Sequence, residues 1–277
     1  MTERRILRRV RGMPTADGAG VKLTRVIGQP TLDHVDPFLL LDEFRSDSAD
    51  DYIAGFPEHP HRGFETVTYM LAGHMRHGDN HGNRGDLGPG SVQWMTAGRG
   101  ILHSEMPMQE DGLMWGFQLW VNLPAKDKMT APRYQDIAAD RIPVVHPAPG
   151  VTARVIAGEF AGATGPVNGI PTEPLYLDLT VEPGAQVTVP LPPEHRAFAY
   201  VFDGAAAEVG RERLARSELA VLGNGDRLRI AGGEATTRLL VVAGRPLNEA
   251  ITRYGPFVMN TPEEIRTAVA DYQAGRF

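Results

Sequence analysis

Short apolar runs that alternate with polar residues recur along the whole chain, and most of them end at glycine, proline or asparagine. This period of two, punctuated by turn residues, is typical of antiparallel β-strands. We therefore predict an all-β fold. The predicted strands are 66–71, 91–95 and 116–123 in the first half, and 175–181, 227–230 and 238–242 in the second.

A helical pattern is convincing only near the C-terminus. Thr261 is suited to the N-cap, Pro262 to the first helical position, and Glu264 completes a capping box. We predict a short helix that packs on a β-barrel and ends at Gly275.

The basic start of the chain could belong to a transit peptide or to a β-hairpin. Ile6, Val10, Val21 and Leu23 alternate with polar residues on either side of a turn at 17–18. We favour the hairpin because this pattern is that of two strands.

A degenerate internal repeat indicates two domains. Residues 69–73 recur in outline as 200–204, at an offset of 131, and residues 87–90 recur as 222–225, at an offset of 135. A chain of 277 residues also exceeds the usual size of one hydrophobic core. We predict two antiparallel β-barrels or sandwiches, with domains at 1–135 and 136–277 and the helix at the end of the second.

Composition restricts the classes of function. The formal charge of −6 would repel a phosphate backbone, which argues against direct nucleic-acid binding. The chain has no cysteine, which excludes disulfides and thiolate chemistry, and no apolar run long enough to cross a membrane. We expect a cytoplasmic protein. Two domains that cover each other would leave little apolar surface, so we expect a monomer.

Histidines are concentrated in one part of the first half. Six of the nine lie between residues 59 and 103. His59 and His61 share one face of a strand because side chains alternate, and His103 and Glu105 repeat that spacing. Folded opposite each other across a barrel, the two pairs would surround one metal ion.

The predicted quartet of three imidazoles and one carboxylate leaves coordination positions open for substrate. Such a donor set suits a catalytic Fe(II), Mn, Ni or Cu ion better than a closed structural zinc site. His34, His74, His77 and His81 stand near turn residues, and we interpret them as structural.

The second half offers an internal control for this interpretation. At an offset of 131, His59, His61 and Glu65 correspond to Pro190, Pro192 and Arg196; at an offset of 135, His103 and Glu105 correspond to Arg238 and Leu240. We therefore expect only the first domain to bind metal, and we interpret His195 as structural or pocket-lining.

Four segments together resemble the pirin family of the bicupins. They are DPFLLLDEF at 36–44, HPHRGFETV at 59–67, AGRGILHSE at 97–105 and YGPFVMNT at 254–261. The resemblance runs from about Arg9 to Phe277 and implies two cupin-type jelly-roll barrels.

The resemblance also bears on the choice of carboxylate ligand. In the general cupin pattern it would be Glu65, whereas in pirins it is the residue two after the last histidine, here Glu105. We choose Glu105 on family grounds. Glu65 then becomes a second-shell partner that could hold a ligand imidazole in its tautomer.

The resemblance implies a quercetinase-type dioxygenase that acts on flavonols or related polyphenols with O2. Its cofactor would be one divalent ion, Fe(II) as the first expectation and Mn, Ni, Cu, Co or Zn as alternatives, and Glu105 would serve both as ligand and as catalytic base. An aromatic substrate needs an apolar slot, and the apolar side chains beside or between the ligand segments are Phe56, Phe64, Trp94, Met106, Trp115 and Phe117. We expect about half of them to line the slot and the others to belong to the barrel core.

Two other functions fit parts of the pattern. Some pirins are metal-responsive or redox-responsive regulators, so a protein that binds a protein partner is the main alternative. A sugar-phosphate isomerase would need Lys and Arg converging on the cavity, but Arg62, Arg76 and Arg99 are scattered.

Overall fold

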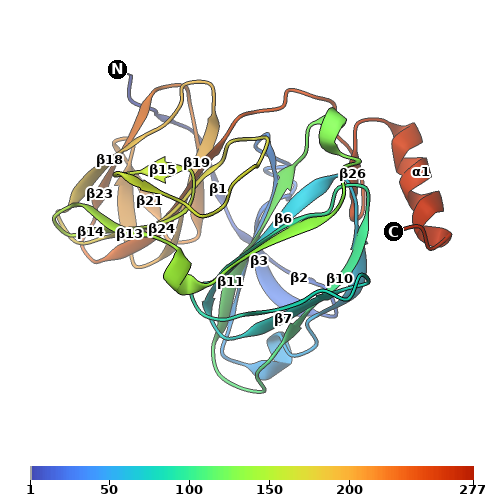
Figure 1. The fold of residues 1–277 in the computed structure, drawn as a ribbon. Helices are drawn as coiled ribbons and strands as arrows, with labels where there is room; N and C mark the ends of the chain where they lie inside the picture. The colour runs from blue at the N-terminus through green and yellow to red at the C-terminus, as the bar shows by residue number, and fades with distance from the viewer. Residues whose placement is uncertain (1) are drawn as a thin grey trace. The chain divides into compact units, whose positions relative to one another are not determined.

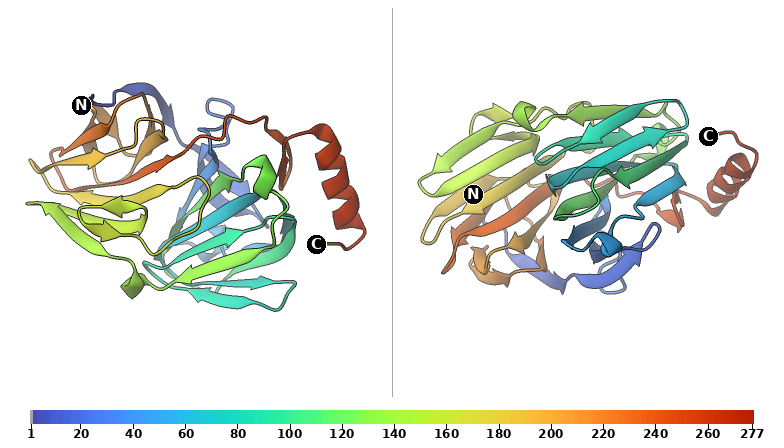
Figure 2. Two further views of the ribbon diagram at one scale, coloured as in Figure 1. Left: turned by 45° about the horizontal axis from the view of Figure 1, so that its top comes forward. Right: turned by 90° about the horizontal axis from the view of Figure 1, so that it is seen from below.

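A computed structural model gives the fold of the chain and describes residues 2–277. Strands make up most of it, as Figures 1 and 2 show, and the one α-helix in this range, α1, spans Pro262–Gln273. Short 3-10 turns occur at Ala49–Asp51, Ala125–Asp127 and Ala139–Arg141. The predicted all-β class with a short C-terminal helix is confirmed.

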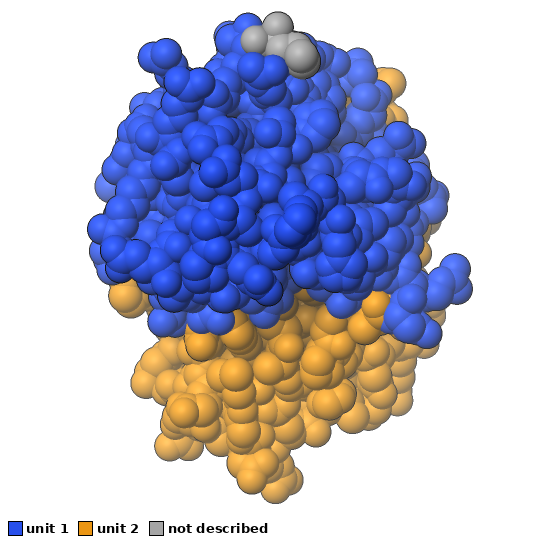
Figure 3. Space-filling view, turned by 90° about the vertical axis from the view of Figure 1, so that its left-hand side faces the viewer, with its two compact units in different colours: residues 1–13, 26–37, 140–246 blue, residues 14–25, 38–139, 247–277 orange. Residues whose placement is uncertain are grey.

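The chain divides into two compact units (Figure 3). Unit 1 holds the residues up to Met13, Val26–Pro37 and Asp140–Pro246, and unit 2 holds Pro14–Arg25, Phe38–Ala139 and Leu247–Phe277. The break at 139/140 lies near the division expected at 135/136. The two ends of the chain do not follow this division. The residues up to Met13 belong to unit 1 with Asp140–Pro246, and Leu247–Phe277 belong to unit 2 with Phe38–Ala139.

Unit 2 is built on a larger and a smaller antiparallel sheet. The order of the seven-stranded sheet is β12-β9-β6-β11-β4-β3-β2, and that of the four-stranded sheet is β5-β10-β7-β8. The strands of the larger sheet are β2 (Met13–Asp17), β3 (Val21–Ile27), β4 (Phe38–Ser46), β6 (Phe64–Ala72), β9 (Val92–Thr96), β11 (Met114–Asn122) and β12 (Arg133–Ile137). Those of the smaller are β5 (Phe56–His61), β7 (Met75–Asp79), β8 (Arg84–Leu87) and β10 (Ile101–Pro107). A short hairpin of β25 (Thr252–Tyr254) and β26 (Phe257–Met259) precedes α1.

Unit 1 repeats this architecture. Its seven-stranded sheet has the order β1-β22-β19-β24-β17-β14-β13, and its four-stranded sheet the order β18-β23-β20-β21. The strands of the larger sheet are β1 (Ile6–Arg11), β13 (Val144–Ala148), β14 (Val151–Ala157), β17 (Leu175–Val181), β19 (Arg196–Asp203), β22 (Glu218–Leu222) and β24 (Thr237–Gly244). Those of the smaller are β18 (Gln186–Pro190), β20 (Ala206–Val209), β21 (Glu212–Ala215) and β23 (Arg227–Gly232); β15 (Glu159–Phe160) and β16 (Ala163–Thr164) form a separate pair.

The equivalent strand orders identify which strands correspond. Residues 69–73 and 200–204 close β6 and β19, so the offset of 131 is right there. The offset of 135 is wrong, because the turn at 222–225 joins β22 to β23 and therefore matches the turn at 97–100 between β9 and β10. His103 and Glu105 correspond to Leu228 and Ile230 rather than to Arg238 and Leu240.

Unit 1 has apolar side chains where unit 2 has its histidines. Leu228 pairs with Val189 across β23 and β18, as His103 pairs with His59 across β10 and β5. His59 and His61 therefore correspond to Val189 and Leu191, one residue before the expected Pro190 and Pro192. Val189, Leu191 and Leu228 belong to a buried apolar core to which both sheets of unit 1 contribute. The interior of this unit is filled by hydrocarbon where a metal would need donor atoms.

The first strands differ in part from the predicted hairpin. β2 and β3 are neighbours joined by a turn at 18–20, as expected for a hairpin. Ile6 and Val10, however, lie on β1, which pairs with β22 at the edge of the other large sheet. The apolar alternation marked these residues as strand, but not which sheet they would join.

The C-terminal helix begins as predicted. Thr261 accepts a hydrogen bond from the backbone N–H of Glu264, and the carboxylate of Glu264 accepts one from the backbone N–H of Thr261. Ile265 and Ala268 of α1 pack with residues of β26 in a small apolar cluster. Within residues 2–277, no helix is long and apolar enough to cross a membrane.

Replacing the cap tests how firmly α1 is anchored. We expect Thr261→Ala to lower the free energy of unfolding by about 1 kcal/mol, because the backbone N–H of Glu264 loses its acceptor and the capping box is broken. Thr267→Ala is the control, since that hydroxyl bonds only the carbonyl of the preceding helical turn. Urea unfolding of both variants gives the comparison. Equal losses would show that the capping box adds nothing.

Candidate metal centre

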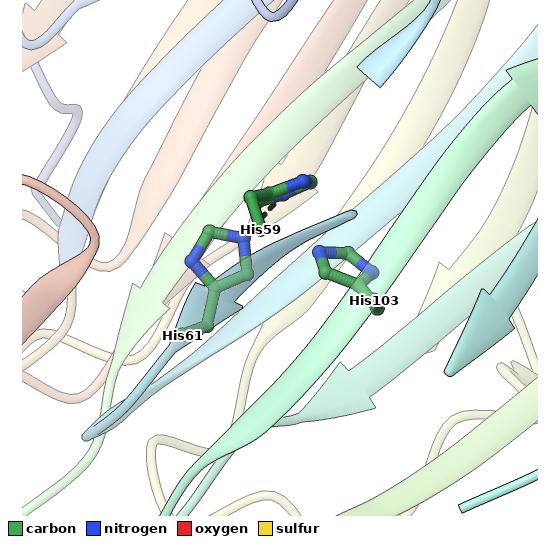
Figure 4. A group of neighbouring side chains, drawn as sticks. All are labelled: His59, His61 and His103. Carbon is green, nitrogen blue, oxygen red and sulfur yellow. Dashed lines mark hydrogen bonds between the residues drawn. The ribbon is translucent and has the colours of Figure 1, made fainter. Parts of the chain in front are cut away.

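Three histidines from two paired strands meet in unit 2. His59 and His61 come from β5, and His103 comes from β10, which pairs with β5 so that His103 lies opposite His59. The three rings converge, as Figure 4 shows, and one nitrogen of each lies within 4.8 Å of the others. The predicted histidine part of the site is therefore assembled by one strand pair.

An irregularity in this pairing sets the direction of the side chains. Between His103 and Glu105 the register shifts, so that Glu105 faces Phe56 and β5 carries one more residue than β10. A bulge of this kind bends a strand and re-aims its side chains. The carbonyl of Pro57, inside the bulge, accepts a hydrogen bond from Nδ1 of His59 at 2.8 Å.

Hydrogen bonding determines which nitrogen of His59 can bind a metal. A carbonyl only accepts, so Nδ1 of His59 carries the proton and Nε2 keeps its lone pair. That Nε2 lies 3.0 Å from Nε2 of His61. Two nitrogens bound at about 2.0–2.1 Å to one ion lie about 2.8–3.0 Å apart at a right angle and about 3.3–3.4 Å apart at a tetrahedral angle. The observed spacing lets both nitrogens bind the same ion.

Burial keeps two of the three imidazoles neutral. His61 and His103 are almost fully buried, and this burial lowers the pKa of each well below its usual value, with the other histidines acting in the same direction. Nε2 of His103 is buried and has no hydrogen-bond partner among the described residues. Neutral imidazoles with an unsatisfied nitrogen fit a divalent metal ion, which supplies the missing partner.

Glu105 is near the histidines but is held from the opposite sheet. Its carboxylate accepts hydrogen bonds from Oγ1 of Thr68 at 2.7 Å and from Nε2 of Gln118 at 2.9 Å. It is not part of the cluster whose donor atoms lie within 4.8 Å of one another, although it lines the same cavity as His59 and His61. Each oxygen accepts one bond and retains a second lone pair.

Glu65 does not contact the ligand imidazoles. The chain turns at Gly63 (φ +88°) between β5 and β6, and along β6 Glu65 has the opposite orientation to Thr68. Its carboxylate accepts a hydrogen bond from Oγ1 of Thr96 at 2.7 Å. The expectation that Glu65 holds a ligand imidazole in its tautomer is therefore not supported, because the strand does not continue past Gly63.

A cavity of about 530 Å³ opens beside His59, His61 and Glu105. Its walls combine aromatic rings, among them Phe44, Phe56 and Trp120, with a few polar groups such as Asp42, Gln118 and Arg253. Of the aromatic side chains that the sequence places beside or between the ligand segments, Phe56 lines it. Phe64, Trp94, Trp115 and Phe117 are buried and do not line it.

The turn after His61 is braced by the C-terminal segment of the chain. Nζ of Lys128 donates hydrogen bonds to the carbonyls of Gly63 and Val258 at 2.7 and 3.0 Å. Arg62 donates to Asp271 of α1, and its guanidinium stacks on the ring of Phe277. Residues more than 190 positions along the chain thus fix the ligand strand, which no local sequence pattern could reveal.

His77 is a site residue that the sequence interpretation missed. It lies on β7, beside β10, is 1% exposed, and its Nδ1 is 3.3 Å from Nδ1 of His103. The polar residues around it favour a structural histidine near a turn. The spacing of Met75, His77 and Asp79 is that of a strand and was the available signal.

Two barrels of one topology, the first with a histidine cluster and the second filled by apolar side chains, define a bicupin. The chain belongs to the pirin family: the family profile described as Pirin matches residues 20–121, and that of the Pirin C-terminal cupin domain matches residues 176–277.

Relatives extend over the whole chain. A Pseudomonas aeruginosa protein named as a candidate quercetin 2,3-dioxygenase is 52% identical over 95% of this chain and 94% of its own. A pirin-like protein of Caulobacter vibrioides is 49% identical over the full length of both. The crystal structure of a quercetin 2,3-dioxygenase from Acinetobacter baumannii has a TM-score of 0.91 at 36% identity and covers 100% of this chain and 99% of its own.

The environment of Glu65 leads to a test by pH. Burial raises the pKa of Glu65 from 4.5 to about 7, so folding takes up a proton between these values, and stability falls as pH rises through that window. Glu65→Gln removes this loss. We expect the variant to gain about 1–3 kcal/mol in free energy of unfolding at pH 8 and little at pH 4.5.

Urea unfolding at both pH values measures this difference, and metal titration of the same variant tests the orientation of the side chain. Because Glu65 points away from the histidines, its metal affinity should match that of the unchanged protein. A weaker affinity would show that Glu65 does orient a ligand imidazole. A difference in stability that does not depend on pH would contradict the raised pKa of the buried carboxyl.

Proposed function

We propose that the protein is a metal-dependent dioxygenase of the quercetinase type, with Fe(II) as its resident ion, that opens the ring of flavonols or related polyphenols. The observation that carries this proposal is the convergence of the imidazoles of His59, His61 and His103 beside a cavity of about 530 Å³ that His59 and His61 line together with aromatic rings. A donor set with open positions beside an apolar slot suits oxygen chemistry on a planar substrate.

The relatives support the same activity. Two of the similar proteins carry quercetin 2,3-dioxygenase in their names, and one of them matches this chain over its full length in three dimensions. Equivalent folds host many functions, so the activity also depends on the donor atoms and the cavity of this chain.

His59, His61 and His103, with Glu105, would hold the ion in this proposal. When bound, the ion would act as a Lewis acid that lowers the pKa of a phenolic hydroxyl, and it would also provide a redox centre for O2. The carboxylate of Glu105 is oriented by Thr68 and Gln118 and faces the cavity, where it can accept the proton of a substrate hydroxyl.

The cavity walls would position a planar ring. Trp120 packs against His61, with ring centroids 5.2 Å apart, and the guanidinium of Arg253 lies 4.7 Å from the centroid of Trp120. Asp42 is held by two hydrogen bonds from Arg25 and offers a polar group at the same wall. Apolar faces with a few fixed polar groups select flat, hydroxylated ligands.

Anaerobic loading with Fe(II), followed by an assay of quercetin consumption with oxygen uptake and carbon monoxide release, tests the proposal. We expect His61→Ala and His103→Ala to lose both bound iron and turnover, because each removes one of three imidazole donors. Glu105→Ala should lose turnover even where iron is retained. His81→Ala is the matched control, since that side chain is exposed in the turn between β7 and β8.

The outcomes separate the parts of the proposal. Full iron occupancy in His103→Ala would contradict the metal centre. Iron binding with no consumption of any flavonol would refute the quercetinase activity and favour the alternative of a metal-responsive protein that binds a protein partner.

Substrate positioning is tested at Phe56, which lines the cavity and pairs with Glu105 of the neighbouring strand. We expect Phe56→Ala to raise KM for quercetin about tenfold with kcat and iron content nearly unchanged, because an apolar wall contributes binding but no chemistry. Tyr254→Ala is the control, since that ring is 66% exposed and does not line the cavity. A fall in kcat at constant KM would place Phe56 in the chemical step.

A further inference from the structure

A second imidazole lies behind His103 on the side away from His59. His77 on β7 is one strand further into the four-stranded sheet and pairs with Glu105 of β10. Its ring centroid is 5.0 Å from that of His103, and the two Nδ1 atoms are 3.3 Å apart. Two nitrogens at this distance share one hydrogen bond.

This contact can have only one donor. A neutral imidazole has one N–H and one lone pair, so one Nδ1 must carry the proton and the other must accept it. If Nδ1 of His77 were the donor, the proton of His103 would sit on Nε2 and block it as a ligand. If Nδ1 of His103 is the donor, its Nε2 presents a lone pair.

We propose that His77 is the positioning residue of the metal centre: its Nδ1 accepts the hydrogen bond from Nδ1–H of His103 and thereby holds His103 in the tautomer whose Nε2 can bind the ion. The inference rests on the metal binding in the proposed function but not on the activity. Ligand histidines generally donate their second N–H to such a partner, which fixes the tautomer and the ring orientation.

In this tautomer the proton of His77 lies on Nε2, which is buried and has no hydrogen-bond partner among the described residues, so binding of the ion to His103 must offset that cost. The ring of His77 is packed edge to face against Tyr134, with centroids 4.8 Å apart, and is almost fully excluded from solvent. The carbonyl of Pro57 does the same for His59 with a backbone group. For His103 the acceptor is a side chain. The strand beside it is β7, whose backbone groups are already used in pairing with β10 and β8.

Three variants of the full-length protein test the proposal with Co(II) as the probe, by titration calorimetry and by the visible spectrum of the bound ion. We expect His77→Phe, which keeps a ring but has no acceptor, to bind Co(II) about 10–100-fold more weakly than the unchanged protein. His77→Asn places an acceptor at the position of Nδ1 and should recover much of the affinity and the spectrum. His81→Phe is the control and should bind normally.

Two results would overturn the proposal. One is a folded His77→Phe protein, judged by its thermal melting without metal, that binds Co(II) as tightly as the unchanged protein. The other is equal weakening in the Asn and Phe variants, because the acceptor would then be irrelevant.

A measurement without substitutions covers the case in which His77→Phe does not fold. Nitrogen-15 NMR of the unchanged, Zn(II)-loaded protein should show the proton of His103 on Nδ1 and an unprotonated Nδ1 on His77. The reverse assignment, or failure of the unchanged protein to bind either ion, would refute the inference. Weaker Co(II) binding by His77→Phe tests the role of His77 without reference to catalysis. Normal metal affinity with no turnover would instead count against the proposed activity.

Discussion

The pairing of β5 with β10 is the constraint on which the candidate site depends. It places His59 opposite His103, and the alternation along β5 brings His61 to the same side. The register shift before Glu105 supplies the carbonyl that orients His59. A slip by one residue would turn each ligand to the other face, so the register must be fixed by more than this pair of strands.

The C-terminal segment of unit 2 supplies much of that fixation. Gly63 has no room for a Cβ, which would lie 2.0 Å from the carbonyl of Val258, and the buried ammonium of Lys128 joins the two backbones. Burial lowers the pKa of Lys128 to about 8, but its three hydrogen bonds to oxygen acceptors offset the cost of burying it. The ring of Phe277 fills the space beside Gly100, at the start of the His103 strand. Both ligand turns are thus closed by residues from the other end of the chain.

Much of this could be predicted from the sequence, where the signals are local. The strand periodicity, the capping box of α1 and the spacing of His59 with His61 each depend on a few adjacent residues. The predictions that were wrong depended on which strands pair. Ile6 and Val10 join the large sheet of unit 1, and the turn at 222–225 matches that at 97–100 rather than that at 87–90. The roles of Glu65 and His77 were likewise hidden, because a strand break at Gly63 and a neighbouring strand decide which side chain touches an imidazole.

The barrel of unit 1 shows that this architecture does not require histidines in its interior. Val189, Leu191 and Leu228 take the positions of the three histidines and complete an apolar core, so this architecture is stable without donor atoms. The histidines of unit 2 are therefore not needed to hold the barrel together, and burying them without a partner costs free energy that hydrocarbon would save. Polar groups that a fold can replace by leucine and valine, yet keeps beside a cavity, are better explained by what they bind than by what they stabilise.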